Sequence, residues 1–162
     1  MKDRSHLSEL IIAANKKTRE RDYWLEKFSD GFERSTFPYD KQKTTGSDKI
    51  FEIVTDNYSG EWVTRLITLS ADSDVRLHII LVTVLTLLLF KYTEKKDIVV
   101  GAPILKPEVE ADFTNTVLAL RIRVNENSSF KELLLEVRKT CVEAAENQGY
   151  PVEVLIDKLG LS

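Results

Sequence analysis

The segment from Tyr92 to Arg121 constrains the fold of this 162-residue chain more than any other. It follows a long apolar stretch and contains a continuous apolar run within Asp97 to Ile104. A short acidic connection then leads to an alternating stretch, Phe113 to Val124. A continuous apolar run is typical of a strand buried on both faces, and alternation also predicts a strand. The segment therefore predicts two strands at the centre of an α/β domain.

Apolar periodicity predicts helices in most of the remaining chain. The predicted helices span Leu7 to Phe28, Glu61 to Ser70, Val75 to Tyr92, Phe130 to about Asn147, and Pro151 to Leu159, with one more strand at Lys49 to Thr55. Ser73 or Asp74 can cap the third helix, and Ser128 or Ser129 the fourth. This order predicts an α/β fold: a two-layer sandwich with a small mixed β-sheet covered by helices.

The predicted helix from Val75 to Tyr92 is apolar on nearly all sides. Its run from Ile79 to Phe90 is the one membrane candidate in the sequence, but it is shorter than the ~20 residues that a spanning helix needs. Thr83 and Thr86 also interrupt it. We therefore expect a core helix lying between two layers, and no membrane partner.

Composition fits one globular domain over residues 1–162, with 43% hydrophobic residues and a formal charge of −3. We expect residues 1–6 to be mobile and the polar segment 32–48 to form a surface loop. The low charge argues against nucleic acid as a partner, because nucleic-acid binding needs a dense basic surface. The single cysteine, Cys141, excludes an internal disulfide and suits a reducing compartment, which predicts a cytoplasmic protein.

The sequence offers no assembled catalytic site. Of its two histidines, His6 lies in a polar N-terminal stretch that we expect to be mobile. His78 opens the predicted apolar helix, where we expect a structural role rather than a catalytic or metal-binding one. Cys141 lies on the predicted core face of its helix, where a thiol is usually inert. The glycines are isolated and form no phosphate-binding loop. From the residues alone, the chain is a soluble α/β domain without evident chemistry.

Four stretches, taken in order, carry a resemblance to a known family. They are Arg21 to Phe28, with its Tyr-Trp pair; Phe90 to Thr93 followed by Asp97 to Pro103; Phe113-Thr114-Asn115-Thr116 with Leu120-Arg121; and Asn147 to Glu153. This ordered set resembles the C-terminal lobe of nonribosomal peptide synthetase condensation domains. The motif residues are Trp24, Gly101, Pro103, Phe113, Asn115, Thr116, Arg121, Gln148, Pro151 and Glu153.

The resemblance implies half of a chloramphenicol acetyltransferase-like fold. Condensation domains are built from two such lobes, and the phosphopantetheine arms of two carrier proteins enter the tunnel between them. The family's catalytic His-His-x-x-x-Asp-Gly motif belongs to the N-terminal lobe and does not occur in this sequence. The resemblance therefore implies no cofactor bound directly, and phosphopantetheine only on partner carrier proteins if the lobe is active.

The chain departs from the family pattern at several positions. The connection between Pro103 and Phe113 is short for the family, and Asp112 replaces its usual glycine. In the last motif, Gly149 and Val152 stand where the family has Asp and Phe. The short connection is the part that normally reaches toward the opposite lobe, so it favours a lobe that works without one.

Two main hypotheses follow for function. The first is a partial condensation domain that lacks catalysis of its own and serves as a structural or docking unit beside adenylation or carrier domains. The second is half of an amide-forming enzyme, completed by an N-terminal lobe on the same gene or another chain. Either could self-associate through an open lobe face. An unrelated α/β interaction module is a third possibility.

The motif residues are expected to have structural roles. We expect Asn115 and Arg121 to tie the long strand to neighbouring loops, and Trp24 to anchor the first helix. We expect Gln148, Pro151 and Glu153 to fix the final helix against the core. No catalytic, cofactor-binding or metal-binding residue is predicted.

Overall fold

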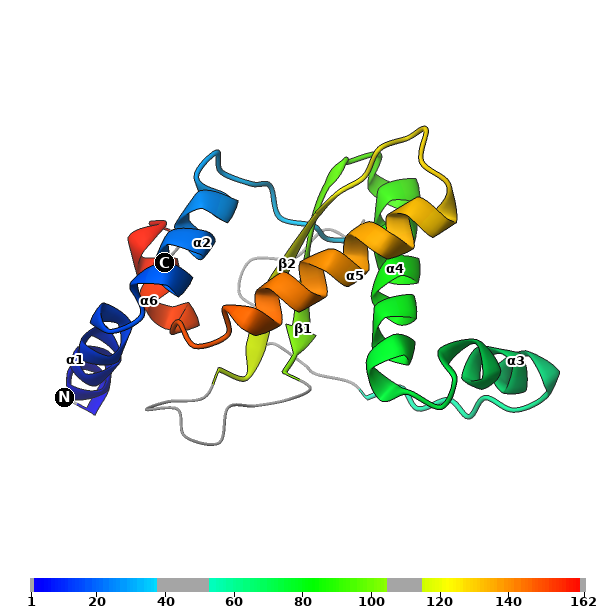
Figure 1. Cartoon of the computed structure of the whole chain (residues 1–162), viewed down its shortest axis with the longest axis horizontal. Helices are drawn as coiled ribbons and strands as arrows, with labels where there is room; N and C mark the ends of the chain where they lie inside the picture. The colour runs from blue at the N-terminus through cyan, green and yellow to red at the C-terminus, as the bar shows by residue number, and fades with distance from the viewer. Residues whose placement is uncertain (1, 38–52, 105–114, 161–162) are drawn as a thin grey trace, which may run out of the picture.

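The computed structural model describes residues 2–37, 53–104 and 115–160 (Figure 1). Its elements, in chain order, are α1 (Lys2–Asn15), α2 (Thr18–Phe28), α3 (Glu61–Ser70), α4 (Asp74–Thr93), β1 (Asp97–Pro103), β2 (Val117–Arg123), α5 (Phe130–Glu146) and α6 (Val152–Lys158). This arrangement confirms the α/β class. Four of the five predicted helices and both strands of the central segment are present, with small changes at their ends.

The strands β1 and β2 pair antiparallel, from Asp97 opposite Arg123 to Pro103 opposite Val117. The sequence predicted a mixed sheet, but the strands in the described ranges contain no parallel pair. Of the strand predicted at Lys49 to Thr55, residues 49–52 lie outside the described residues, and residues 53–55 have no strand structure. The described sheet is therefore smaller and simpler than predicted.

The core lies between one face of the sheet and the helices α4 and α5. Cross-strand neighbours on this face are buried, including Ile98 opposite Ile122 and Val100 opposite Leu120. Helix α5 packs on β2, and α4 packs on both β1 and α5. At the other end of the molecule, α1, α2 and α6 form a second group of helices (Figure 1).

The helix predicted from Leu7 to Phe28 is two helices. Lys17 has φ −109° and ψ 60°, which breaks the helix between α1 and α2. The apolar period continues across this break because each helix buries one of its faces. Ala14 is buried in α1, before the break, and Trp24 is buried in α2, after it. Between them, the charged segment from Lys16 to Asp22 provides no large apolar side chain to hold one continuous helix.

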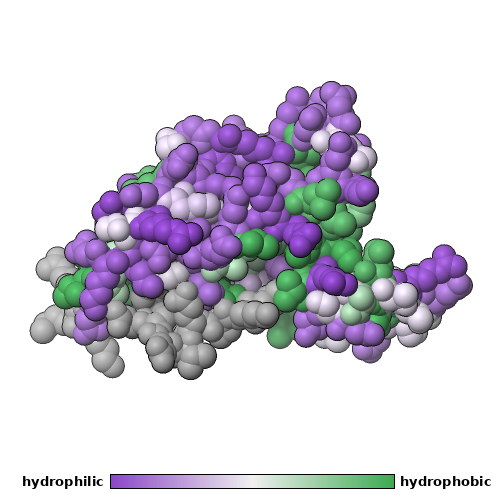
Figure 2. Space-filling view, in the orientation of Figure 1, coloured by the Kyte–Doolittle hydropathy of each residue, from purple (hydrophilic) through white to green (hydrophobic). Residues whose placement is uncertain are grey.

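Helix α4 differs from its prediction in burial. One face is buried and includes Ile79, Thr83 and Leu89. The opposite face is apolar but exposed, with Leu81 at 51% and Val84 at 48%. Figure 2 shows hydrophobic surface over this part of the molecule. The helix thus covers the sheet on one side only, and the prediction that it lies between two layers was wrong for the described residues.

Among the described residues, α4 is the one helix long and apolar enough to cross a membrane by length and composition; 28% of the tested window is buried. Its buried face packs against β1 and α5, as in a helix of a protein core. Its start is fixed by Ser73, whose Oγ accepts a hydrogen bond from the amide of Arg76. We interpret α4 as a core helix with one uncovered face.

Candidate functional site

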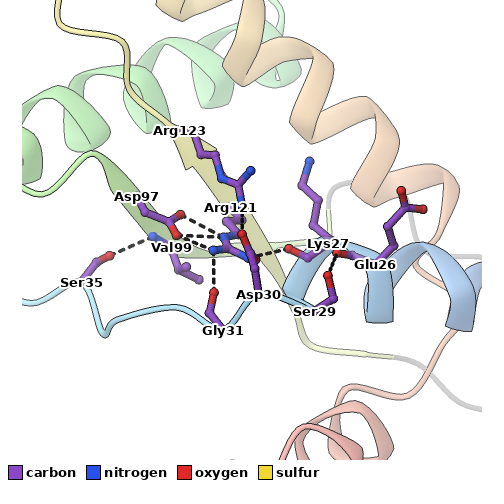
Figure 3. Close-up of polar contacts among 10 residues, drawn as sticks. All are labelled: Glu26, Lys27, Ser29, Asp30, Gly31, Ser35, Asp97, Val99, Arg121 and Arg123. Carbon is purple, nitrogen blue, oxygen red and sulfur yellow. Dashed lines mark hydrogen bonds and ion pairs between the residues drawn. The ribbon is translucent and has the colours of Figure 1, made fainter.

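The most highly connected polar residue in the described chain is Arg121, on the sheet face opposite α4 and α5 (Figure 3). Its guanidinium donates to both carboxylate oxygens of Asp97 in β1, with Nε–Oδ1 at 2.9 Å. It also donates to Lys27 O in the last turn of α2 (2.7 Å), and to Asp30 Oδ1 (2.6 Å) and Gly31 O (2.6 Å) in the segment after α2. We call Lys27, Asp30, Gly31, Asp97 and Arg121 the arginine node.

The arginine node is held in place by the burial of the Arg121 side chain and by its ion pairs with Asp30 and Asp97. The Arg121 side chain is only 4% exposed, and its plane lies near the Phe28 ring. Hydrogen bonds from Arg121 lower the pKa of Asp30, and those to Asp97 raise the pKa of Arg121. Arg123 also pairs with Asp30. The planar fork of arginine allows several acceptors to be bound at once, which a lysine cannot do.

A second polar junction centres on Asn115, just before β2. Its Nδ2 donates to the carbonyl oxygens of Gln148 (2.7 Å) and Tyr150 (2.8 Å), and its Oδ1 accepts from the amide of Val152 (3.0 Å). Gln148 and Tyr150 belong to the turn between α5 and α6, and Val152 is the first residue of α6. We call this set the asparagine junction; it fixes the start of α6 relative to the sheet.

Trp24 connects the first part of the chain to the same turn. Its Nε1 donates to the carbonyl oxygen of Asn147 at 2.8 Å, and its ring is buried. It packs against the rings of Tyr23 and Phe28. The end of α5 is thereby held by an aromatic cluster on α2 as well as by the asparagine junction.

The other motif residues are more scattered. Gly101 lies in β1, where an added Cβ would come within 3.1 Å of Val117, so the close strand pairing favours glycine. Pro151 is buried at the N-cap of α6 rather than within the helix. Pro103, Thr116 and Glu153 are exposed, Gln148 is half-buried, and Phe113 lies outside the described residues.

The imidazole of His78 and the thiol of Cys141 are side chains of types that often act in catalysis, and both are partly buried among apolar residues. Burial lowers the pKa of His78 and raises the pKa of the Cys141 thiol to about 11. Both line one apolar cavity between α4, the sheet and α5. A thiol with so high a pKa is a poor nucleophile at neutral pH. The described residues contain no group of three His, Cys, Asp or Glu side chains able to hold a metal.

Sequence reasoning identified Arg121 and Asn115 but missed their partners. Nothing in the sequence marks Asp30 or Gly31 as a partner of Arg121, and Asp97 was expected only as the first residue of a strand and of a family stretch. Ser35 was also missed: its Oγ accepts from the amide of Val99 at 2.8 Å and so ties the segment after α2 to the edge of β1. These contacts span 24 to 94 residues of sequence, which periodicity cannot detect.

Chemically, the two polar centres hold structure together. The donors of Arg121 and Asn115 are directed at carboxylates and carbonyl oxygens of their own chain. A general base must have a free lone pair within reach of a reacting proton. The Arg121 guanidinium has no acceptor, and the Asn115 carboxamide oxygen, which accepts the Val152 amide, is a very weak base. The carboxylates of Asp30 and Asp97 are both paired with Arg121.

Comparison with known proteins gives a consistent result. The profile of the family described as "Condensation domain" matches residues 8–162. The chain is 33% identical to bacitracin synthase 3 of Bacillus licheniformis over 165 residues, which is 98% of this chain and 3% of that protein. It is also 33% identical to gramicidin S synthase 2 of Aneurinibacillus migulanus, over 87% of this chain and 3% of that protein. The chain thus spans a small fraction of the synthases it matches.

Solved structures agree on the fold. The starter condensation domain of rhizomide synthetase, crystallised with C8-CoA and Leu-SNAC, matches 90% of this chain with a TM-score of 0.63 at 18% identity. A second structure of that domain, in a product-released conformation, gives a TM-score of 0.64 at 16% identity. This chain covers 33% and 34% of those two chains.

Proposed function

The chain belongs to the condensation-domain family of nonribosomal peptide synthetases, and from this premise we propose that it is a partial condensation domain without catalytic activity of its own. Its role is that of a structural or docking unit within a peptide synthetase. The N-terminal lobe's His-His-x-x-x-Asp-Gly motif is absent from the sequence. A lobe without that motif has no base for the acceptor amine.

One observation carries this proposal most directly: the polar motif side chains are used for internal bonds. Arg121 joins α2 to both strands, and Asn115 joins β2 to the turn before α6. A family motif retained for these bonds preserves the shape of the lobe independently of chemistry. The shape is therefore available for docking even where catalysis is lost.

The partners we propose are the adenylation and carrier domains of a peptide synthetase. The synthases that resemble this chain are far longer than the matched region, which fits a unit working among other domains. The lobe binds no cofactor itself; phosphopantetheine enters only on carrier proteins. We place this assembly in the cytoplasm, without nucleic acid or membrane as a partner.

A second candidate is favoured by the uncovered apolar surface. Leu81 and Val84 on α4, and Leu69 on α3, are all about half exposed or more. Apolar residues grouped in this way usually mark an interface. The chain would then be one half of an amide-forming enzyme, completed by an N-terminal lobe that covers this side.

An amide-formation assay separates the two candidates. Donor-loaded and acceptor-loaded carrier proteins are incubated with the chain, and intact-protein mass spectrometry detects the condensed product. The docking proposal predicts no product above the uncatalysed background, together with saturable binding of an adjacent adenylation or carrier domain by calorimetry. Failure to bind any of these domains would count against docking. Product formed only with a separate N-terminal lobe would favour the second candidate.

A further inference from the structure

An apolar cavity of about 180 Å³ lies between α4, the sheet and α5; of the residues in the two polar centres, it touches only Gln148. Its floor is formed by buried side chains of the sheet: Ala102, Leu118 and Leu120. Its mouth lies between the two helices, where Val75 is 39% exposed and Val142 is 48% exposed. The cavity therefore combines an apolar floor with an opening to solvent.

The lining has the chemistry of a site for an aliphatic group. Apart from His78, Cys141 and Gln148, it consists of aliphatic side chains and a proline, and no Phe, Tyr or Trp lines it among the described residues. An apolar cavity of about 150 Å³ is known to stay dry and to bind a six-carbon ring. A cavity of 180 Å³ thus has room for about six carbon atoms.

Two polar side chains are placed to receive the end of such a group. His78 comes from the first turns of α4, and Gln148 follows the end of α5, so they approach the cavity from different helices. An imidazole and a carboxamide each provide a donor and an acceptor for a neutral hydroxyl or amide. Few polar groups around an apolar pocket are the usual pattern of small-molecule sites.

We propose that this cavity is a binding site for a short, unbranched aliphatic chain of about six carbons that carries a neutral hydrogen-bonding end group. The chain lies against Leu118 and Leu120 and its end group lies near His78 and Gln148. The site is formed within one lobe by α4, the sheet and α5, so it requires neither a second lobe nor the docking role proposed above.

The size of the cavity sets a chain-length dependence. Each methylene moved from water into the cavity should tighten binding about fourfold. Affinity should therefore rise from 1-butanol to 1-hexanol by about an order of magnitude. It should stop rising for 1-decanol, because the additional methylenes find no apolar wall to cover.

The experiment is a titration of the full chain with n-alkanols, observed by methyl NMR. We expect saturable shifts for the methyl groups of Ile79, Leu118 and Leu120, and none for Leu155 in α6, which does not line the cavity. Ala145→Leu places a larger side chain at the mouth and should weaken 1-hexanol binding at least tenfold. Leucine is a good helix former, so α5 is expected to keep its fold.

Lys139→Leu is the matched control. It adds the same side chain at an exposed position of α5 outside the cavity, and should leave 1-hexanol binding unchanged. Absence of saturable shifts, equal weakening in both variants, or affinity that keeps rising through 1-decanol would overturn the proposal. Sedimentation of the same samples measures whether the chain forms dimers. If the NMR shifts of the cavity-lining methyl groups follow dimer formation rather than alkanol concentration, a second copy covers the cavity and the proposal fails.

Discussion

The arginine node and the outer face of α4 differ in whether the chain itself provides contact partners for their side chains. At the node, a buried guanidinium meets carboxylate or carbonyl oxygens from α2, β1 and the segment that follows α2. On α4, Leu81, Val84 and Leu88 are large apolar side chains that nothing in the described structure covers. The polar side of the lobe is complete within one chain, and the apolar side is not.

This difference distinguishes features that are stable within the chain alone from features that need a partner. A polar centre that satisfies its own hydrogen bonds needs no partner, because its buried groups are already paired. An exposed apolar face gains free energy only when something covers it. The node is therefore stable within the isolated lobe, whereas the exposed face of α4 would gain stability from any partner that covers it.

The strongest way to break the comparison is to remove Arg121. We expect Arg121→Ala to lower the free energy of unfolding by about 4 kcal/mol, since it leaves the Asp97 carboxylate and two carbonyl oxygens without their donor and removes one of the two partners of Asp30. Urea denaturation followed by circular dichroism measures this loss. Arg123→Ala is the control; its side chain is 65% exposed, so we expect a loss of about 0.5 kcal/mol. Equal losses in the two variants would show that the node is no more than a surface ion pair.

Two adjacent leucines on α4, Leu88 and Leu89, test whether the exposed face of this helix contributes to stability. Leu89 is buried and Leu88 is 43% exposed. Leu89→Ala should cost about 3 kcal/mol through lost burial and a new cavity. Leu88→Ala should cost no more than about 0.5 kcal/mol. If Leu88→Ala is as damaging as Leu89→Ala, and the damage grows with protein concentration, a second copy already covers the face.

The asparagine junction should give a smaller effect than the node. Asn115→Ala leaves two carbonyl oxygens and the Val152 amide without their partner, so we expect a loss of about 2 kcal/mol. Thr116→Ala, at the neighbouring exposed position, should change stability by less than about 0.5 kcal/mol. Melting temperatures of both variants test this difference, and an unchanged value for Asn115→Ala would argue against its structural role.

The smallest expected effect is a pH dependence of the node. The pKa of Asp30 is lowered in the folded state, chiefly by its hydrogen bond from Arg121. Its contribution to stability is therefore fully present above the ordinary aspartate pKa of about 3.9, and is lost as pH falls through the lower folded value. The difference in urea midpoint between the wild type and Asp30→Asn should shrink from pH 7 to pH 3.

Arg121→Lys provides the control for that titration. Lysine keeps the charge but cannot hold several acceptors at once, so Asp30→Asn should have less effect in this background at pH 7. An Asp30→Asn difference that stays constant from pH 7 to pH 3 would mean that the carboxylate charge does not support the node.

Local features of the fold could be predicted from sequence, because their causes lie within a few residues. Ser129 caps α5 with a reciprocal bond to Glu132, a pattern that is visible in the sequence. Strands were expected for the same reason at Asp97 to Ile104 and Phe113 to Val124, and the structure has them at Asp97–Pro103 and Val117–Arg123. Ordered motifs identified Asn115 and Arg121 as positions of interest before any contact was known.

Other features could not be predicted, since they depend on what lies beside each element. Lys17 breaks a helix whose apolar period continues on both sides of it. The apolar composition of α4 suits a helix covered on all sides as well as one covered on a single side. Periodicity does not indicate which face has a neighbour. Asp30 and Asp97 became recognisable as partners of Arg121 only when the chain brought α2 and β1 together.

The most direct test of the central claim is the amide-formation assay carried out on the lobe alone and on the lobe mixed with a separate condensation-domain N-terminal lobe. Intact-protein mass spectrometry would follow transfer of the donor acyl group to the acceptor amine. Our account predicts no condensed product from the lobe alone, even at saturating carrier protein. Product above background from the lobe alone would contradict the account, because it would require a catalytic base other than the His-His-x-x-x-Asp-Gly motif, which the sequence lacks.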